Sequence, residues 1–347
     1  MLAYTYFKNH TLKLYEKPVP VLQGGDAIIK VIACSICGTD VRTYRFGSSK
    51  IDEGRTIGHE VVGIITELSA DAPGNFQKGD HVAVAPAIGC GACYCCKTGH
   101  TNMCEDLHTI GYQYDGGFAE YMRIPARALN MGNVYKLPNV EDYTFYTLSE
   151  PLACAINAQS YLNINKEDDV VIFGSGIIGC MHAELALHAG ARSIYIAETS
   201  DERINEAGKL LDKIHFINSN IMNVGEEIRR MTGGKGADVA IIACSVGKAQ
   251  TDAMNLLAKR GRISLFGGLP GESNGFIDSN LIHYREISVY GVHASTPEQN
   301  QKAMTLIYNG DIDVKKYITK RYYLEEVDQA FTDINGGKVM KAIIVNR

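Results

Sequence analysis

The stretch Val170-Val171-Ile172-Phe173-Gly174-Ser175-Gly176-Ile177-Ile178-Gly179 decides the fold of this chain of 347 residues. It is an apolar run that opens directly into the pattern G-x-G-x-x-G, which predicts a buried strand, a tight turn and the start of a helix. The glycines let the backbone approach a pyrophosphate, and the first N–H groups of the helix point at its oxygens. We therefore expect a dinucleotide to be bound by Gly174, Ser175, Gly176, Ile177, Ile178 and Gly179.

The residues after this turn complete a strand–helix–strand unit. Residues 180–189 predict a helix, and residues 193–197 predict a second strand that ends at Glu198. Glu198 lies 19 residues past Gly179, where an acid binds the ribose hydroxyls of NAD and repels the 2′-phosphate of NADP. Arg203 follows closely and is either an acceptor for that phosphate or a solvated helix residue. We therefore predict NAD in preference to NADP.

Strands and helices continue to alternate after this unit, as in a doubly wound parallel sheet. Further strands are predicted at residues 214–217, 239–243, 262–266 and 287–290, and helices at residues 223–231 and 248–258. Cofactor contacts gather at the carboxyl ends of parallel strands. On this ground Cys244, Ser245 and Gly267 are further cofactor-binding candidates, and Arg203 and Val292 are counted with them. After about residue 293 the alternation stops, and a helix near residues 297–308 and a closing strand at residues 342–345 follow.

A region of short strands precedes the dinucleotide-binding turn and carries a candidate metal site. Residues 27–34 predict a strand, and we expect Cys37 and Thr39 to lie in the turn that follows it, where loops commonly carry chemistry. His59 and Glu60 open another predicted strand. A thiolate, an imidazole and a carboxylate hold zinc through three protein ligands and leave one coordination position open. Such residues also occur together by chance, so this set requires support from the rest of the chain.

Five of the ten cysteines fall within residues 90–104. In a reducing compartment such a cluster is typical of metal ligands rather than of disulfides. Four of the five follow the spacing C-x2-C-x2-C-x7-C, which predicts a closed, structural zinc site, with an iron–sulfur cluster as the alternative. The predicted ligands are Cys90, Cys93, Cys96 and Cys104, and Cys95 is left free.

The composition narrows the class of protein. Apolar residues make up 46% of the chain and charged residues 21%, and the formal net charge is only −5. This balance allows a large core and gives no sign of a nucleic-acid partner. We find no apolar run long enough to cross a membrane and no secretory signal. The expectation is therefore a cytoplasmic protein of two domains with no membrane partner.

Together these segments resemble the zinc-containing medium-chain dehydrogenase/reductase family over essentially the whole chain. The matching segments occur in the family's order and are Cys37-Gly38-Thr39-Asp40, Gly58-His59-Glu60, the four-cysteine lobe at residues 89–105, Glu150-Pro151-Leu152 and the glycine-rich turn. The resemblance implies an α/β protein with a GroES-like β catalytic domain at residues 1–155 and 292–347. A Rossmann domain with a doubly wound parallel sheet would occupy residues 156–291 and bind NAD.

The resemblance also implies roles for the candidate residues. Cys37, His59 and Glu60 would hold a catalytic zinc, and Glu150 would be a further ligand of that zinc or a carboxylate beside it. Thr39 would be the first hydroxyl of a proton relay, so that Thr39, Glu60 and Glu150 are the catalytic residues. With the four-cysteine lobe this gives two zinc ions per chain. Many relatives have a histidine three residues after the threonine, where this chain has Arg42, so the outer end of the relay stays open.

The segments around His59 and Glu150 look most like polyol (sorbitol-type) and L-threonine dehydrogenases. We therefore expect an enzyme that transfers a hydride from a secondary alcohol, with a polyol or sugar alcohol as the first choice, to NAD. L-threonine 3-dehydrogenase and a sugar-alcohol-phosphate dehydrogenase, for example for galactitol 1-phosphate, are the alternatives. A phosphorylated substrate would need basic pocket residues, for which the candidates are Arg42, Arg45, Lys50 and Arg55.

A non-enzymatic NAD-binding or zinc-storage protein is a further alternative, but it predicts an incomplete set of catalytic ligands. By resemblance to the family, the chain is expected to form a homodimer or homotetramer. The predicted strand at residues 287–290 is a candidate pairing surface, because an unpaired edge strand favours pairing with its mate.

Overall fold

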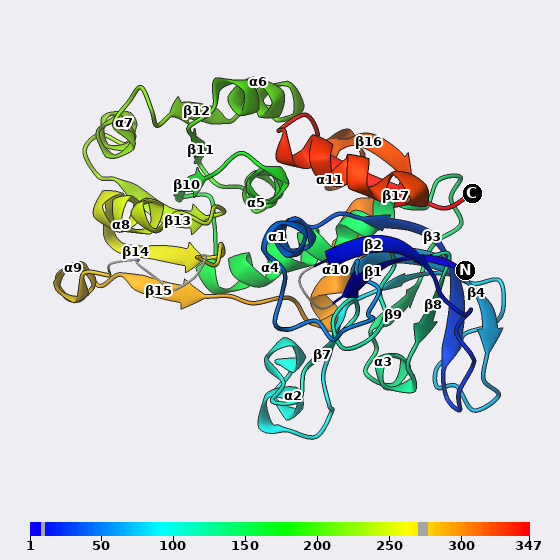
Figure 1. The fold of residues 1–347 in the computed structure, drawn as a ribbon. Coiled ribbons are helices and arrows are strands. Elements are labelled where there is room, and N and C mark those ends of the chain that lie inside the picture. The colour runs from blue at the N-terminus through cyan, green and yellow to red at the C-terminus, as the bar shows by residue number, and fades with distance from the viewer. Residues whose placement is uncertain (8–10, 270–276) are drawn as a thin grey trace. The chain divides into compact units, whose positions relative to one another are not determined.

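The computed structural model describes residues 1–7, 11–269 and 277–347. Two compact units make up the fold (Figure 1): the first contains Met1–Ala153 and Ala294–Arg347, and the second contains Cys154–His293. The sequence-based domain boundaries, 155/156 and 291/292, differ from these breaks by two residues each. Both ends of the chain therefore belong to the first unit.

The first unit is built on a sheet of seven strands in the order β16-β17-β3-β4-β5-β9, with β8 also paired to β3. These strands are β3 (Ala27–Ser35), β4 (Glu60–Leu68), β5 (His81–Val84), β8 (Tyr121–Ile124), β9 (Val134–Lys136), β16 (Ile318–Tyr323) and β17 (Lys341–Val345). All neighbours are antiparallel except β16 and β17. The C-terminal β17 lies beside β3, so the two ends of the chain meet in one sheet (Figure 1).

Shorter elements complete the first unit. Its two-stranded sheets pair β1 (Leu2–Phe7) with β2 (Thr11–Glu16) and β6 (Ala87–Ile88) with β7 (His108–Thr109). Its helices are α1 (Gly38–Phe46), α2 (Tyr94–Lys97), α3 (Ala126–Asn130), α10 (Pro297–Tyr308) and α11 (Val327–Asn335), and α4 (Ser149–Leu162) continues into the second unit. Helix α10 begins as its sequence predicts, because Pro297 occupies its first turn and Thr296 with Gln299 forms a capping box.

The second unit is a parallel sheet of six strands in the order β12-β11-β10-β13-β14-β15. Its strands are β10 (Asp169–Phe173), β11 (Ser193–Glu198), β12 (His215–Asn218), β13 (Ala237–Ile242), β14 (Leu257–Leu265) and β15 (Ser288–Gly291). Its helices are α5 (Ile177–His188), α6 (Asp201–Leu210), α7 (Val224–Met231), α8 (Gly247–Leu256) and α9 (Ser279–Arg285). This order confirms the expected doubly wound sheet of a dinucleotide-binding fold.

The central strand β10 shows why the apolar run at residues 170–173 predicts this fold. All five residues of β10 are buried, and α5 packs against it and against β11. A strand buried along its whole length is covered on both faces, which is typical of parallel sheets and explains a continuous rather than an alternating apolar pattern.

Two sequence-based expectations differ from the structure. Cys37 and Thr39 do not lie in a loop. Cys37 is the N-cap of α1, and Thr39 lies in the first helical turn. The helix begins here because the side chain of Asp40 accepts a hydrogen bond from the backbone N–H of Cys37. The helix expected at residues 248–258 ends at Leu256, where β14 begins. β16 and α11 were not predicted. None of the helices in the described part of the chain is both long and apolar enough to cross a membrane.

Candidate metal centres and nucleotide-binding turn

Strand pairing in the first unit brings Cys37, His59 and Glu60 together. Ser35, at the end of β3, pairs with Glu60, at the start of the antiparallel β4. The residues just beyond one strand therefore lie beside those that open the next. The three side chains present ligand atoms that all lie within 4.8 Å of one another.

The surroundings of Glu60 fit a metal ligand. Glu60 is completely buried, and its Oε1 atom has no hydrogen-bond partner, while Oε2 accepts hydrogen bonds from Ser35 and Lys341. A buried carboxylate oxygen without a partner is costly, unless a cation binds it. A sulfur, a ring nitrogen and a carboxylate oxygen form the donor set of a catalytic zinc site. The residues present therefore fit zinc.

Asp40 belongs to this site, although it was not among the predicted residues. Its side chain is buried, its Oδ2 accepts a hydrogen bond of 2.9 Å from the backbone N–H of Cys37, and its Oδ1 lies 3.5 Å from Nδ1 of His59. Burial lowers the pKa of His59, but the charges of Asp40 and Cys37 outweigh it and raise that pKa well above its usual value. A carboxylate beside a ligating histidine fixes the orientation of the ring.

Glu150 and Thr39 lie around this group in different ways. Glu150 is in the first turn of α4 and is buried, but it is not among the three residues whose ligand atoms lie within 4.8 Å. Its charge acts on Lys341, the lysine that binds Glu60. Thr39 is exposed in the first turn of α1, as is Arg42 one turn later.

Tyr112 is a second residue that sequence reasoning missed. Its ring centroid lies 6.2 Å from that of His59, and its phenol is close enough to Thr39 for the threonine hydroxyl to influence its pKa. Burial raises the pKa of Tyr112, so its phenol stays neutral and can both donate and accept a hydrogen bond. A tyrosine in an irregular segment gives no signal of such a role in the sequence.

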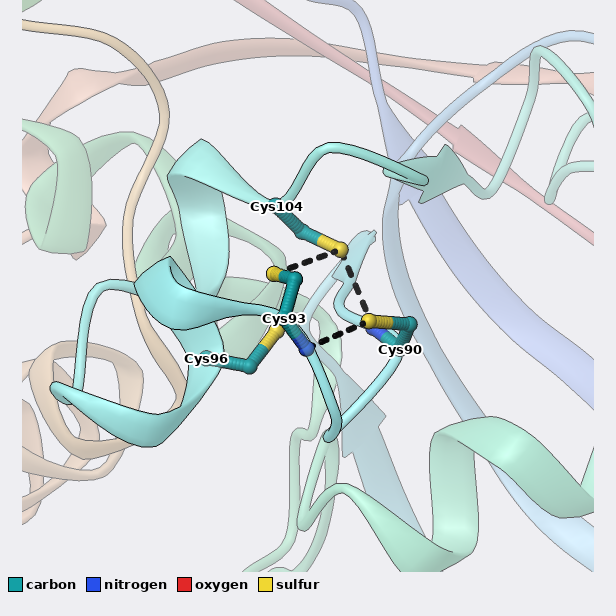
Figure 2. Close-up of side chains that lie close together, drawn as sticks. All are labelled: Cys90, Cys93, Cys96 and Cys104. Carbon is teal, nitrogen blue, oxygen red and sulfur yellow. Dashed lines mark hydrogen bonds between the residues drawn. The ribbon is translucent and has the colours of Figure 1, made fainter.

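The four cysteines of the lobe lie together and form a second candidate metal centre (Figure 2). The sulfur atoms of Cys90, Cys93, Cys96 and Cys104 all lie within 4.8 Å of one another. The sulfurs of Cys93 and Cys104 are 3.8 Å apart, which is about the edge of a tetrahedron with Zn–S bonds of ~2.3 Å. Cys95 is not part of the group. The residues therefore fit a closed zinc site with the predicted ligands.

Backbone N–H groups of the lobe stabilise the thiolate form that a metal ligand requires. The N–H groups of Ala92 and Cys93 donate to the sulfur of Cys90, and such donors lower the pKa of Cys90 and bring that of Cys93 to about 6. Burial instead raises the pKa of Cys96 to about 12. A metal that binds here displaces the remaining thiol protons.

Arg127 joins the two ends of this lobe and was also missed. Its Nε donates to the carbonyl of Gly89 at 2.7 Å, and its Nη1 donates to Oδ2 of Asp106 at 2.8 Å. Gly89 immediately precedes Cys90, and Asp106 follows Cys104 by two positions. The guanidinium therefore holds both ends of the cysteine loop in place.

Each glycine of the G-x-G-x-x-G turn has its own structural reason. Gly174 has a φ of +106°, which side chains rarely tolerate. A Cβ on Gly179 would collide with the carbonyl oxygen of Gly174. A Cβ on Gly176, the N-cap of α5, would meet nothing within 4 Å. The open space beside a helix N-terminus is where a pyrophosphate approaches the backbone.

Glu198 lies at the end of β11, as expected, and is held in place by this turn. One of its oxygens accepts hydrogen bonds from the N–H and the hydroxyl of Ser175, at 3.0 and 3.1 Å, and the other accepts from the N–H of Thr199 at 2.7 Å. Burial raises the pKa of Glu198, but these donors outweigh it and lower the pKa below its usual value. Arg203 is largely exposed, with Nη1 4.0 Å from Glu198 Oε2.

The other cofactor-binding candidates follow the carboxyl ends of neighbouring strands. A Cβ on Gly174 would lie 3.2 Å from the carbonyl oxygen of Ala243, and one on Gly267 would collide with the carbonyl oxygen of Cys244. These contacts bring the loops after β10, β13 and β14 together. Cys244 is half-buried and Ser245 exposed, and Val292 directly follows the edge strand β15.

Two protein-family models match this chain, the first within the first unit and the second mainly within the second unit. The family model described as the alcohol dehydrogenase GroES-like domain matches residues 23–138, and the model described as zinc-binding dehydrogenase matches residues 178–309. L-threonine 3-dehydrogenase of Pyrococcus abyssi is 32% identical over 96% of this chain and 94% of its own length. Sorbitol dehydrogenase of Bacillus subtilis is 29% identical over 95% of this chain and 92% of its own length.

Solved structures show the same architecture. A zinc-binding dehydrogenase from Sinorhizobium meliloti, bound to NADP, superimposes with a TM-score of 0.91 at 26% identity, over 99% of this chain and 98% of that one. The expected GroES-like and Rossmann domains are thereby confirmed. The chain belongs to the zinc-binding alcohol dehydrogenase family and is a zinc-dependent oxidoreductase that uses a nicotinamide dinucleotide.

Proposed function

We propose that this enzyme oxidises a secondary alcohol of the polyol or sugar-alcohol class and reduces NAD. The observation that carries the proposal is the group of half-buried Cys37 with buried His59 and Glu60, whose ligand atoms lie within 4.8 Å of one another. When bound there, zinc supplies a Lewis acid that lowers the pKa of an alcohol by several units. Similarity to sorbitol dehydrogenase of Bacillus subtilis supports a polyol as the alcohol.

The chain's own residues would position the substrate and move its proton. Cys37, His59 and Glu60 would hold the metal, with Glu150 nearby as a further carboxylate. Thr39 would accept the proton of the substrate hydroxyl while giving its own hydroxyl proton to the nearby Tyr112 phenol, which would in turn release its proton to water. Tyr112 then supplies the outer end of the relay, which Arg42 leaves open. A nicotinamide dinucleotide, when bound by the glycine-rich turn, would supply the acceptor for the hydride of the substrate carbon.

The choice of NAD rests on Glu198. Its carboxylate is ionised and held by Ser175 and Thr199, so a 2′-phosphate would meet a fixed negative charge. The neighbouring Arg203 is the residue that would favour NADP. Its Nη1 lies 4.0 Å from Oε2 of Glu198, so the carboxylate offsets its positive charge. We therefore propose NAD as the preferred cofactor, bound by the glycine-rich turn and the loops after β13 and β14.

L-threonine is the second candidate substrate, because L-threonine 3-dehydrogenase of Pyrococcus abyssi is 32% identical to this chain. A phosphorylated sugar alcohol is less well supported. Of its candidate residues, Arg42, Arg45 and Lys50 are exposed, and Arg55 lies 3.9 Å from Asp52, an ion-pair distance. These side chains give no sign of a built phosphate site.

A substrate screen tests the proposal. The zinc-loaded enzyme is assayed for reduction of NAD and of NADP with sorbitol, xylitol, galactitol, L-threonine and galactitol 1-phosphate. We expect at least one polyol with NAD to give the highest kcat/KM. Preference for L-threonine selects the second candidate. If no polyol reduces either cofactor while both metal centres are filled, the polyol proposal is wrong.

A further inference from the structure

A buried lysine, Lys341, lies beside the candidate metal ligand Glu60. Lys341 opens β17 and is 2% exposed. Lysine is almost never buried without a partner, because desolvation of its ammonium group is costly. Its position therefore requires an explanation from the groups around it.

The ammonium of Lys341 binds one oxygen of Glu60. Its Nζ donates to Oε2 of Glu60 at 2.5 Å and to the carbonyl of Ile36 at 2.9 Å. The hydroxyl of Ser35 donates to the same Oε2. The other oxygen, Oε1, is buried and has no hydrogen-bond partner. The protein thus fully satisfies one side of the carboxylate and leaves the other side available to a metal.

The sheet explains how these groups meet. β3 is central and pairs with β17 on one side and with β4 on the other. Ser35 pairs with Ile343 of β17 and with Glu60 of β4. Lys341 and Glu60 are 281 residues apart in sequence, yet the pairing fixes them on either side of the end of β3. Strand positions are rigid, so the contact is preorganised rather than formed on metal binding.

The charges around Lys341 favour both a fixed ammonium group and a metal ion. Glu60, Cys37 and Glu150 act on Lys341 as neighbouring negative groups, and the buried carboxylate of Asp40 lies beside His59 in the same site. With Cys37 as a thiolate, as a zinc ligand is, these four groups would carry a total charge of about −4. Lys341 supplies +1 and a zinc ion would supply +2, so the two cations together offset most of this negative charge. Without Lys341, Oε2 of Glu60 would be buried without its charged partner, which is strongly unfavourable.

We propose that Lys341 is a positioning residue of the catalytic metal centre, which holds Glu60 through Oε2 so that Oε1 is kept as the metal ligand. This inference rests on the proposed function, because it takes Cys37, His59 and Glu60 as the zinc ligands. It predicts that loss of the ammonium group weakens metal binding, since Glu60 then loses the contact that orients it. Groups that orient metal ligands typically contribute about 10–100-fold to metal affinity.

The experiment measures metal retention rather than activity. Full-length wild type, Lys341→Met and Lys341→Arg are loaded with zinc, and zinc transfer to a chromogenic chelator is followed over time. The four-cysteine lobe is an internal reference. We expect Lys341→Met to lose one of two zinc ions about tenfold or more faster than wild type, with the second zinc unchanged. Lys341→Arg, which keeps the charge, should restore part of the retention.

Lys320→Met is the matched control. Lys320 lies on the neighbouring β16 and forms an ion pair of 2.8 Å with Asp333, so its loss removes a lysine from the same sheet without touching the metal group. It should leave both zinc ions at the wild-type rate. Should Lys341→Met fail to fold, Ser35→Ala tests the same oxygen of Glu60, and we expect a smaller acceleration of the loss of one zinc.

The outcomes separate this inference from the proposed function. Loss of both zinc ions at the wild-type rate from folded Lys341→Met would overturn the role of Lys341 alone, as would the same acceleration in Lys320→Met. If wild type binds zinc only in the four-cysteine lobe, the ligand set itself is wrong, and the proposed function fails with it. If no alcohol is oxidised but Lys341→Met still loses one zinc faster, the substrate proposal fails and the role of Lys341 stands.

Discussion

At the scale of single residues, the hydroxyls around the metal group can be tested one atom at a time. Thr39 is exposed and lies two residues from Cys37, and Tyr112 is close enough for Thr39 to influence its pKa. Thr39→Val keeps the shape of the side chain and removes the hydroxyl. We expect kcat to fall about 100-fold or more, as for other proton-transfer groups, with both zinc ions retained. Tyr112→Phe should lower kcat by less and shift its pH profile.

These two variants also have a contradicting outcome. If Thr39→Val and Tyr112→Phe keep the kcat and the pH profile of wild type, neither hydroxyl carries the proton. Steady-state kinetics at several pH values, with zinc content measured on the same samples, distinguishes a lost relay from a lost metal ion.

The carboxylate of Glu198 predicts cofactor choice at the same scale. Glu198→Ser removes the negative charge and leaves Arg203, whose Nη1 lies 4.0 Å from that carboxylate. We expect the KM for NAD to rise about 10–100-fold, the value of a lost charged hydrogen bond of ~1.5–3 kcal/mol, and the KM for NADP to fall. Glu202→Ser, at an exposed position of α6, is the control. Unchanged kinetics with both cofactors would show that Glu198 does not contact the ribose.

At the scale of elements, the glycine-rich turn makes a prediction that separates folding from binding. A Cβ on Gly179 collides with the backbone of Gly174, whereas one on Gly176 meets nothing within 4 Å. Gly179→Ala should therefore lower both Tm and NAD affinity. Gly176→Ala should keep the wild-type Tm and lose NAD affinity, because the added methyl group occupies the space of the pyrophosphate. Thermal unfolding and NAD titration of both variants provide the measurement, and equal Tm losses would contradict it.

The four-cysteine lobe offers a matched pair of adjacent cysteines. Cys96 belongs to the sulfur group, and Cys95 does not. Cys96→Ser should reduce the zinc content from two ions to one per chain and lower Tm, because structural zinc contributes directly to folding. Cys95→Ser should change neither. Metal analysis and thermal unfolding test both variants, and zinc loss from Cys95→Ser would mean that the wrong neighbour was assigned.

At the scale of the whole molecule, the structure suggests a surface through which two copies of the chain would associate. β15 is an edge strand of the six-stranded sheet and pairs only with β14 among the described strands. We propose that two copies pair along it, since an edge strand presents unpaired N–H and C=O groups. Tyr290→Lys should shift the mass measured by light scattering toward the monomer, while Tyr284→Lys, at an exposed position of α9, should not. An unchanged mass for Tyr290→Lys would place the interface elsewhere.

The sequence by itself determined the parts of this protein in which function follows from neighbouring residues. The glycine-rich turn, Glu198 and the four cysteines lie within short segments, and local backbone geometry decides their roles, so their spacing predicted a dinucleotide and a structural zinc. The tertiary structure alone decided the contacts of Asp40 with His59, of Tyr112 with Thr39 and of Lys341 with Glu60. The last pair is 281 residues apart, and only the pairing of β17, β3 and β4 brings the two charges together. Pairing between strands that are far apart in sequence leaves no local sequence pattern. It depends on which strands pack into the same sheet and core, and not on the spacing of residues along the chain.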